Sequence, residues 1–98
     1  MTLTKQQEGA NLTVAVEGRL DTVTAPQLEE ALKTSLDGVT RLTLDFSRLV
    51  YVSSAGLRVI LTAQKRMAQK GKMVVKNLQE TVREVFEVTG FTGILTIE

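Results

Sequence analysis

Hydrophobic positions at the start of the chain alternate with polar ones, or gather as β-branched residues, in two short segments, 2–7 and 11–16. Between them stands Glu8-Gly9-Ala10, a short stretch with a glycine of the kind that closes tight turns. A period of two places every second side chain on one face of a strand. The pair of segments therefore predicts a hairpin of two strands.

Helical spacing replaces this alternation after the second strand. Thr24 is suited to the N-cap position, Pro26 to the first turn and Gln27 to the third position of a capping box. One face of the segment that ends at Gly38 is hydrophobic, at Leu28, Ala31, Leu32 and Leu36. These start and stop signals predict the first helix.

Strands and helices then follow one another. Residues 41–46 and 72–76 are typical of strands, and residues 53–71 between them have the hydrophobic spacing of a helix that stops at a glycine. A strand, a helix and a second strand in this order predict parallel strands joined by a right-handed crossover.

A third helix is predicted between Asn77, which forms a cap signal with Glu80, and Gly90, and residues 93–97 supply a last strand. The order β-β-α-β-α-β-α-β predicts an α/β fold with a mixed sheet whose later strands are parallel. The central strands are too short to decide whether helices cover one face of the sheet or both. At 98 residues we expect a single domain, residues 1–98.

Composition narrows the choice of partners. Twelve basic residues against 11 acidic ones give a net charge of +1, which offers no reason to expect a nucleic acid or an anionic lipid surface. Cysteine is absent, and the chain shows neither a leader pattern nor a hydrophobic stretch of about 18 residues. We therefore expect a cytoplasmic protein without membrane insertion.

Missing residue types also narrow the chemistry. Without histidine or cysteine the chain cannot build a Ser-His triad, a thiolate nucleophile or an ordinary zinc site. Gly71-Lys72 is followed by Met73, where a phosphate-binding P-loop needs a hydroxyl for magnesium. We expect no enzyme activity, no cofactor and no metal.

A hydrophobic segment, residues 50–61, is interrupted by two serines and two further small residues. We expect Ser53 to be the N-cap of the second helix, because a serine hydroxyl accepts well from a first-turn amide. Ser54 is then the first helical residue, with a free hydroxyl directed to solvent, and Ala55 and Gly56 keep its surroundings small. A phosphate on Ser54 is tolerated by the helix start, but it is repelled by a partner surface built for a neutral hydroxyl.

The segments 17–24 and 47–54 are predicted to be neighbouring loops, because the carboxyl ends of parallel strands lie at one edge of a sheet. Asp21 and Thr22 then share a rim with the serine pair. The aspartate either makes a local turn by accepting from its own backbone, or orients a serine hydroxyl and positions a metal-nucleotide brought by a kinase. The residues leave both roles open.

The second helix is predicted to bury a stripe formed by Leu57, Ile60, Leu61, Met67 and Ala68. Gln64 is a polar residue within that stripe, and Arg58 lies on the opposite side of the helix with Lys65. Val59 lies on the flank beside Arg66. There it is either covered by a neighbouring element or exposed as a contact for a partner.

Three segments resemble the STAS domain family, and more narrowly its bacterial anti-sigma factor antagonists. They are VEGRLDTVTAPQLEEAL (16–32), LTLDFSRLVYVSSAGLRVIL (42–61) and VREVFEVTGFTGILTI (82–97), with GKMVV between the last two. Together they span nearly the whole chain, and the middle segment is the most specific. The resemblance implies a small mixed sheet with helices mainly on one face.

The resemblance also implies a function. In this family the unphosphorylated protein binds an anti-sigma factor with serine kinase activity and frees the sigma factor, and phosphorylation ends that binding. The family pattern places the acceptor at Ser54, before Ala55, Gly56 and Leu57. Asp21 matches an acidic residue implicated in partner binding. The implied partners are the anti-sigma factor kinase and a PP2C-type phosphatase.

The leading hypothesis is therefore a phosphoswitch with a docking rim formed by Asp21, Thr22 and the 46–54 loop. The partner surface also includes Ala55, Gly56, Arg58 and Val59. Family members often have an aspartate before the acceptor serine, whereas this chain has Ser53, which makes Ser53 the runner-up acceptor. Two alternatives are a STAS adaptor without phosphorylation, as in stressosomes or transporter complexes, and a small-ligand binder at the helix start.

Overall fold

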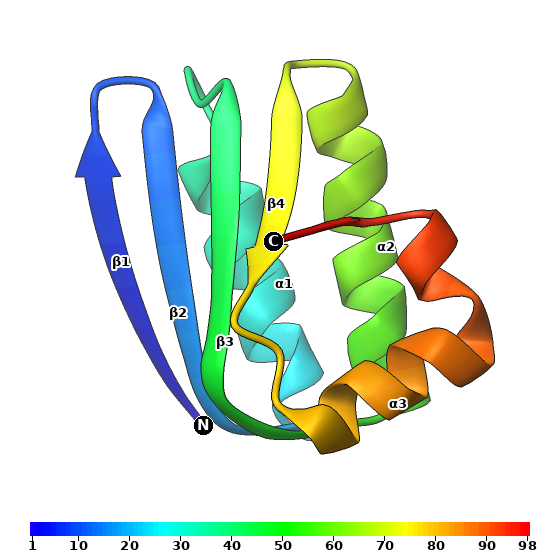
Figure 1. The fold of residues 1–98 in the computed structure, drawn as a ribbon. Helices are drawn as coiled ribbons and strands as arrows, with labels where there is room; N and C mark the ends of the chain where they lie inside the picture. The colour runs from blue at the N-terminus through cyan, green and yellow to red at the C-terminus, as the bar shows by residue number, and fades with distance from the viewer.

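The computed structural model describes residues 1–98 as five strands and three helices, in the order that the hydrophobic pattern predicts (Figure 1). The elements are β1 Thr2–Glu8, β2 Asn11–Leu20, α1 Ala25–Ser35, β3 Arg41–Val52, α2 Ser54–Ala68, β4 Lys72–Lys76, α3 Glu80–Thr89 and β5 Thr96–Ile97, with a short 3-10 helix, η1, at Phe91–Gly93. The α/β class is confirmed.

Strand order in the sheet follows the chain, β1-β2-β3-β4-β5. The hairpin strands β1 and β2 are antiparallel, and every later neighbour pair is parallel, so the prediction of a mixed sheet is confirmed. The carboxyl ends of β2 and β3 lie next to each other, with Leu20 opposite Val52. This arrangement brings the turn before α1 beside the start of α2.

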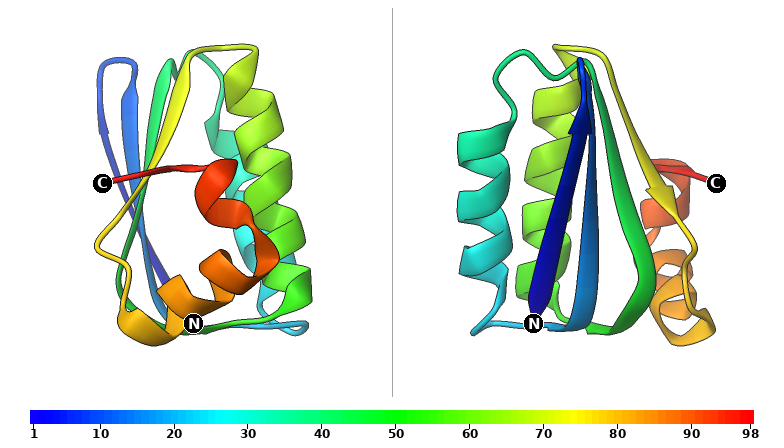
Figure 2. Two further views of the ribbon diagram at one scale, coloured as in Figure 1. Left: turned by 45° about the vertical axis from the view of Figure 1, so that its right-hand side comes forward. Right: turned by 90° about the vertical axis from the view of Figure 1, so that its left-hand side faces the viewer.

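Helices α1 and α2 lie side by side over one face of the sheet (Figures 1 and 2). The strand residues that meet them are buried, namely Leu12, Val14, Val16, Leu42, Leu44, Phe46, Met73 and Val75. Helix α3 joins the same core through Phe86, whose ring centroid lies 6.5 Å from that of Phe46. The other face of the central strands carries partly exposed side chains such as Thr13, Thr43 and Asp45. Helices α1 and α2 therefore cover one face of the sheet.

Strands β2 and β3 run further than the hydrophobic pattern predicts. The docking loop expected at 46–54 is strand as far as Val52, and the loop expected at 17–24 is strand as far as Leu20. The register between the two strands shifts twice in this stretch, as at β-bulges. Bulges interrupt the period of two, so in the second half of β3 the buried side chains come at every third residue, at Phe46, Leu49 and Val52.

Two predicted helix starts differ from the structure. Thr24 stands at the N-cap of α1, but its hydroxyl does not cap the helix and bonds within the preceding turn instead. Helix α3 has Gln79 as its N-cap, so the cap predicted at Asn77 is wrong. Asn77 adopts a left-handed φ of 62° and donates its side-chain amide to Asp45 at 3.1 Å. A carboxylate on the adjacent strand thus replaces the helix start as its partner.

The end of the chain also departs from the prediction. The strand expected at 93–97 is reduced to the two residues of β5, because η1 occupies the residues before it. Gly90 ends α3 with a left-handed φ of 81°, as the glycine signal predicts.

Helix α2 buries a different surface from the predicted stripe. Val59 and Ala63 are buried, whereas Leu61 is half-buried and Ala68 is exposed. The reason is that α2 packs against both the sheet and α1, so its buried surface is turned toward the neighbouring helix. Gln64 is half-buried, and its side-chain oxygen has no hydrogen-bond partner.

We predict that Gly71→Ala lowers the free energy of unfolding by about 3 kcal/mol, the size of a strong overpacking effect. A Cβ at this position would stand 1.9 Å from the Thr40 carbonyl oxygen, which also accepts from the Lys72 amide. Urea unfolding measures the loss. Gly93→Ala is the matched control, because a Cβ there has nothing within 4 Å. Equal midpoints for the two variants would contradict the prediction.

Candidate functional site

The candidate site forms where the end of β2 meets the start of α2. The Ser53 backbone amide donates to the Leu20 carbonyl oxygen at 2.8 Å. A Cβ on Gly56 would stand 2.8 Å from the Leu20 Cγ and 3.0 Å from its carbonyl oxygen. Only a glycine allows this approach without a shift of neighbouring atoms. The small residues in the hydrophobic segment therefore let the helix start pack on the end of β2.

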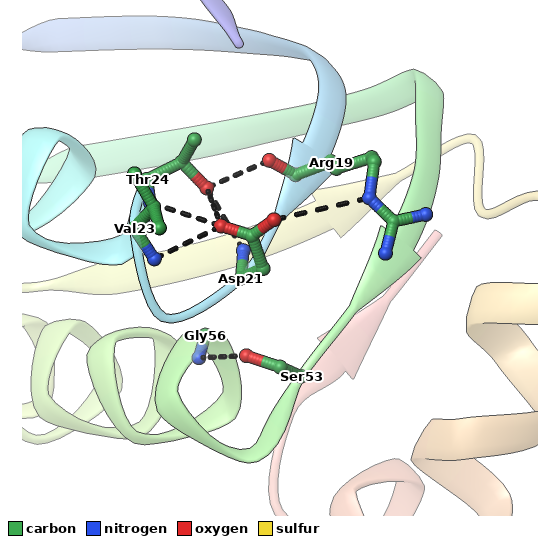
Figure 3. A network of polar contacts seen from close by, with 6 residues as sticks. All are labelled: Arg19, Asp21, Val23, Thr24, Ser53 and Gly56. Atoms are coloured by element: carbon green, nitrogen blue, oxygen red, sulfur yellow. Dashed lines mark hydrogen bonds and ion pairs between the residues drawn. The ribbon is translucent and has the colours of Figure 1, made fainter.

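Ser53 is the N-cap of α2. Its Oγ accepts from the Gly56 amide at 3.3 Å (Figure 3). Its carbonyl oxygen accepts from the Leu57 amide at 2.9 Å. The side chain is half-buried. The cap interpretation of Ser53 is confirmed, and its hydroxyl is occupied within the fold.

Ser54 is the first residue of α2 and is exposed. The side-chain hydrogen bond at this helix start belongs to Ser53 and not to Ser54. The next two residues do not shield the Ser54 hydroxyl, because Ala55 has a small, half-buried side chain and Gly56 is buried and has none. The predicted position of Ser54, at the first helical residue, is confirmed.

Asp21 organises the turn between β2 and α1 (Figure 3). Its Oδ1 accepts from the backbone amides of Val23 and Thr24, each at 3.0 Å. The Thr24 hydroxyl accepts from the Asp21 amide at 2.8 Å and donates to the Arg19 carbonyl oxygen at 2.7 Å. Of the two roles left open, the turn role is the one that these contacts show. The carboxylate makes no hydrogen bond to either serine.

These hydrogen bonds further stabilise the ionised form of Asp21. The backbone amide of Thr24 is the largest cause that lowers the pKa of this carboxyl group below its ordinary value, although desolvation opposes it. The Thr24 hydroxyl, the Val23 amide and the charge of Arg19 lower the pKa further. The rim therefore carries a fixed negative charge at neutral pH.

Arg19 and Tyr51 add a second feature to this rim. They are paired across β2 and β3, and the Arg19 guanidinium carbon lies 4.1 Å from the centroid of the Tyr51 ring. The Arg19 Nε lies 3.8 Å from Asp21 Oδ2. Tyr51 is 40% exposed, and two more large hydrophobic side chains are exposed nearby in sequence, Val50 at 50% and Val23 at 78%.

Val50 and Tyr51 lie within the docking loop predicted at 46–54, although the sequence analysis did not single them out, and Val23 lies within the predicted loop 17–24. The run Val50-Tyr51-Val52 forms the end of β3 and not a loop. In the structure we redefine the docking rim, predicted at Asp21, Thr22 and the 46–54 loop, as residues 19–24 together with residues 50–58. It combines exposed hydrophobic side chains, a carboxylate and the Ser54 hydroxyl, which is a composition typical of protein interfaces.

On α2 the structure separates two residues that the sequence placed on one partner surface. Arg58 is exposed, whereas Val59 is only 6% exposed. Val59 lines a groove between α1 and α2, beside Leu32 and Ala63. Of the two roles left open for Val59, cover by a neighbouring element is the one observed. Thr22, the remaining predicted contact, is exposed in the Asp21 turn.

The side chains of the chain form no group of three or more acidic residues that could hold a metal ion. None of the three helices is both long enough and hydrophobic enough to cross a bilayer.

Comparison with known proteins agrees with this geometry. The family model described as "Mlab, STAS domain" matches residues 3–96. BtrV of Bordetella bronchiseptica, described as a candidate anti-sigma factor antagonist, is 40% identical and aligns with 99% of this chain and 85% of its own length. An anti-sigma-B factor antagonist of Listeria monocytogenes is 30% identical, over 96% of this chain and 84% of its own.

Solved structures show the same fold. The anti-sigma factor antagonist SpoIIAA in its unphosphorylated form superposes with a TM-score of 0.85 at 22% identity, over 99% of this chain and 88% of its own. An anti-sigma factor antagonist from Mycobacterium paratuberculosis reaches 0.88 at 24% identity, over 98% and 83%. With a family model that covers nearly all of its residues, the chain belongs to the STAS domain family.

Proposed function

We propose that this STAS domain is an anti-sigma factor antagonist that phosphorylation of Ser54 switches off. In the unphosphorylated form the docking rim binds an anti-sigma factor with serine kinase activity, and the sigma factor is released. The observation that carries the proposal is the exposed Ser54 hydroxyl at the first residue of α2, next to a Ser53 hydroxyl that is already used as a cap. The names of the relatives support the class of partner.

The proposed covalent step is transfer of the γ-phosphoryl group of Mg-ATP. The Ser54 Oγ attacks the γ-phosphorus, an oxygen–phosphorus bond forms, and the bond to the bridging oxygen of ADP breaks. The serine proton passes to a base of the kinase, and ADP leaves. A PP2C-type phosphatase restores the hydroxyl by hydrolysis, in which water takes the place of the serine oxygen on phosphorus.

Phosphorylation would end binding through charge. A phosphoserine carries about −1.5 to −2 charges at neutral pH. It would stand on a rim where the Asp21 carboxylate already holds a negative charge. A partner surface that buries a neutral hydroxyl cannot compensate for the desolvation of this dianion. The switch thus needs no rearrangement of the fold.

We predict that incubation with the anti-sigma factor kinase and Mg-ATP adds one phosphate, on Ser54. Ser54→Ala should abolish the addition. Ser53→Ala should retain it while lowering the free energy of unfolding by about 1 kcal/mol, because a helix cap is lost. Intact mass and peptide mapping measure the site. Phosphate on Ser53 would refute the assignment, and intact binding without any phosphate would favour the adaptor role.

We predict that Ser54→Asp weakens binding to the anti-sigma factor about a hundredfold, because a negative charge buried at an interface without a matching cation costs several kcal/mol. Ser54→Ala should bind as well as the unphosphorylated protein. Thr92→Asp is the matched control, since it adds the same charge at an exposed residue of η1. Calorimetric titration measures the affinities. Equal affinities for the two Ser54 variants would contradict the proposal that phosphorylation of Ser54 ends binding.

We predict that Asp21→Asn weakens binding about tenfold and reduces its salt dependence, because a rim charge is lost while an oxygen acceptor for the turn remains. Asp37→Asn, at an exposed residue after α1, is the matched control. Unchanged affinity and salt dependence would show that Asp21 only makes its turn.

The same variant has a pH signature. The pKa of Asp21 is lower in the folded chain than its ordinary 3.8, so its charge stabilises the fold above that value. This stabilisation is lost as the pH falls through the folded pKa. The difference in stability between the parent chain and Asp21→Asn should therefore shrink on acidification, which unfolding midpoints at neutral and acidic pH would measure.

A further inference from the structure

Arg58 stands one helical turn after Ser54 on the exposed side of α2. The ion pairs of the chain join residues of the sheet and its adjoining turn, and none of them includes Arg58. The Arg58 side chain makes no hydrogen bond, and the Thr62 hydroxyl donates to the backbone carbonyl oxygen of Arg58 at 3.0 Å. The guanidinium is therefore a free cation beside the candidate acceptor.

Helix geometry directs this cation toward Ser54. Side chains four residues apart are neighbours on a helix surface, with Cβ atoms about 5–6 Å apart. Helical side chains also lean toward the N-terminus, so the Arg58 guanidinium reaches back over the preceding turn. A guanidinium matches a phosphate group with two parallel hydrogen bonds.

The other charges near the helix start do not compete for Arg58. Asp21 uses Oδ1 for the amides of its own turn, and Arg19 lies beside its Oδ2. Arg19 in turn is placed over the Tyr51 ring. The charges of the facing turn thus have partners already, and they leave Arg58 available to a new anion.

We propose that Arg58 is the internal counter-cation of phosphorylated Ser54. The inference rests on the proposed function, because it takes Ser54 as the acceptor. Phosphorylation then changes the docking rim twice: it adds a dianion, and it withdraws a guanidinium from the surface that the partner would otherwise meet. It also explains how α2 holds the phosphate at its first residue without unfolding, since the first-turn amides and Arg58 share its charge.

The test is phosphorus NMR titration of the full chain with phosphoserine installed genetically at position 54, at an ionic strength of about 0.15 M. Three forms are compared: the parent sequence, Arg58→Gln and Lys65→Gln. Lys65 is the matched control, because it is exposed on the same side of α2 but 11 residues from Ser54, about 16 Å along the helix axis. That distance exceeds the screening length of about 8–10 Å near physiological salt.

The second pKa of a phosphoserine is ordinarily about 6. A paired guanidinium lowers it, so we expect a value about 0.3 higher in Arg58→Gln than in the parent chain, the size of one ion pair between adjacent turns. Lys65→Gln should match the parent. Titration curves that coincide for the parent and Arg58→Gln would overturn the pairing, and so would an equal rise in Lys65→Gln, which would indicate a general field.

Failure of this inference is distinct from failure of the proposed function. The phosphoserine is present whether or not a kinase recognises the chain, so the NMR titration reports on Arg58 alone. Absence of phosphate transfer to Ser54 in the kinase reaction would reject the proposed function and would be read by mass, independently of the titration.

Discussion

The candidate site depends on the close approach of α2 to the end of β2. Gly56 leaves no side chain between the helix backbone and Leu20, and the Ser53 amide donates to the Leu20 carbonyl oxygen in the same place. The helix start and the turn that follows β2 are therefore held as one unit. Ser54 and the Asp21 turn therefore lie at the same edge of the sheet.

Two serines at the start of α2 have different roles because one helix needs only one cap. Ser53 is half-buried and its oxygen accepts from the Gly56 amide, which leaves Ser54 exposed. The cap fixes the orientation of the helix start, and the free amides of the first turn favour an anion there. The cap role of Ser53 thus leaves the Ser54 side chain without a hydrogen bond at the helix start.

The turn after β2 contributes a charge whose position is fixed by its own backbone. Asp21 accepts from two amides of the turn, and its pKa is lowered chiefly by the first of them, from Thr24. Its second oxygen faces Arg19, which lies over Tyr51. The carboxylate that makes the turn is therefore also a charge at the docking rim.

Local signals determined a large part of the fold from the sequence. Alternation, helical spacing and the glycines at the helix ends predicted the order of elements, the class of sheet, and the positions of Ser53 and Ser54, because caps and periodicity act over a few residues. Contacts between distant segments decided the rest. Strands β2 and β3 continue through two register shifts. The Asn77 side chain donates to Asp45 and does not cap α3. Helix α1 packs beside Val59. The exposed Tyr51 and its contact with Arg19 likewise depend on strand register, which the pairing of two strands sets and no local pattern records.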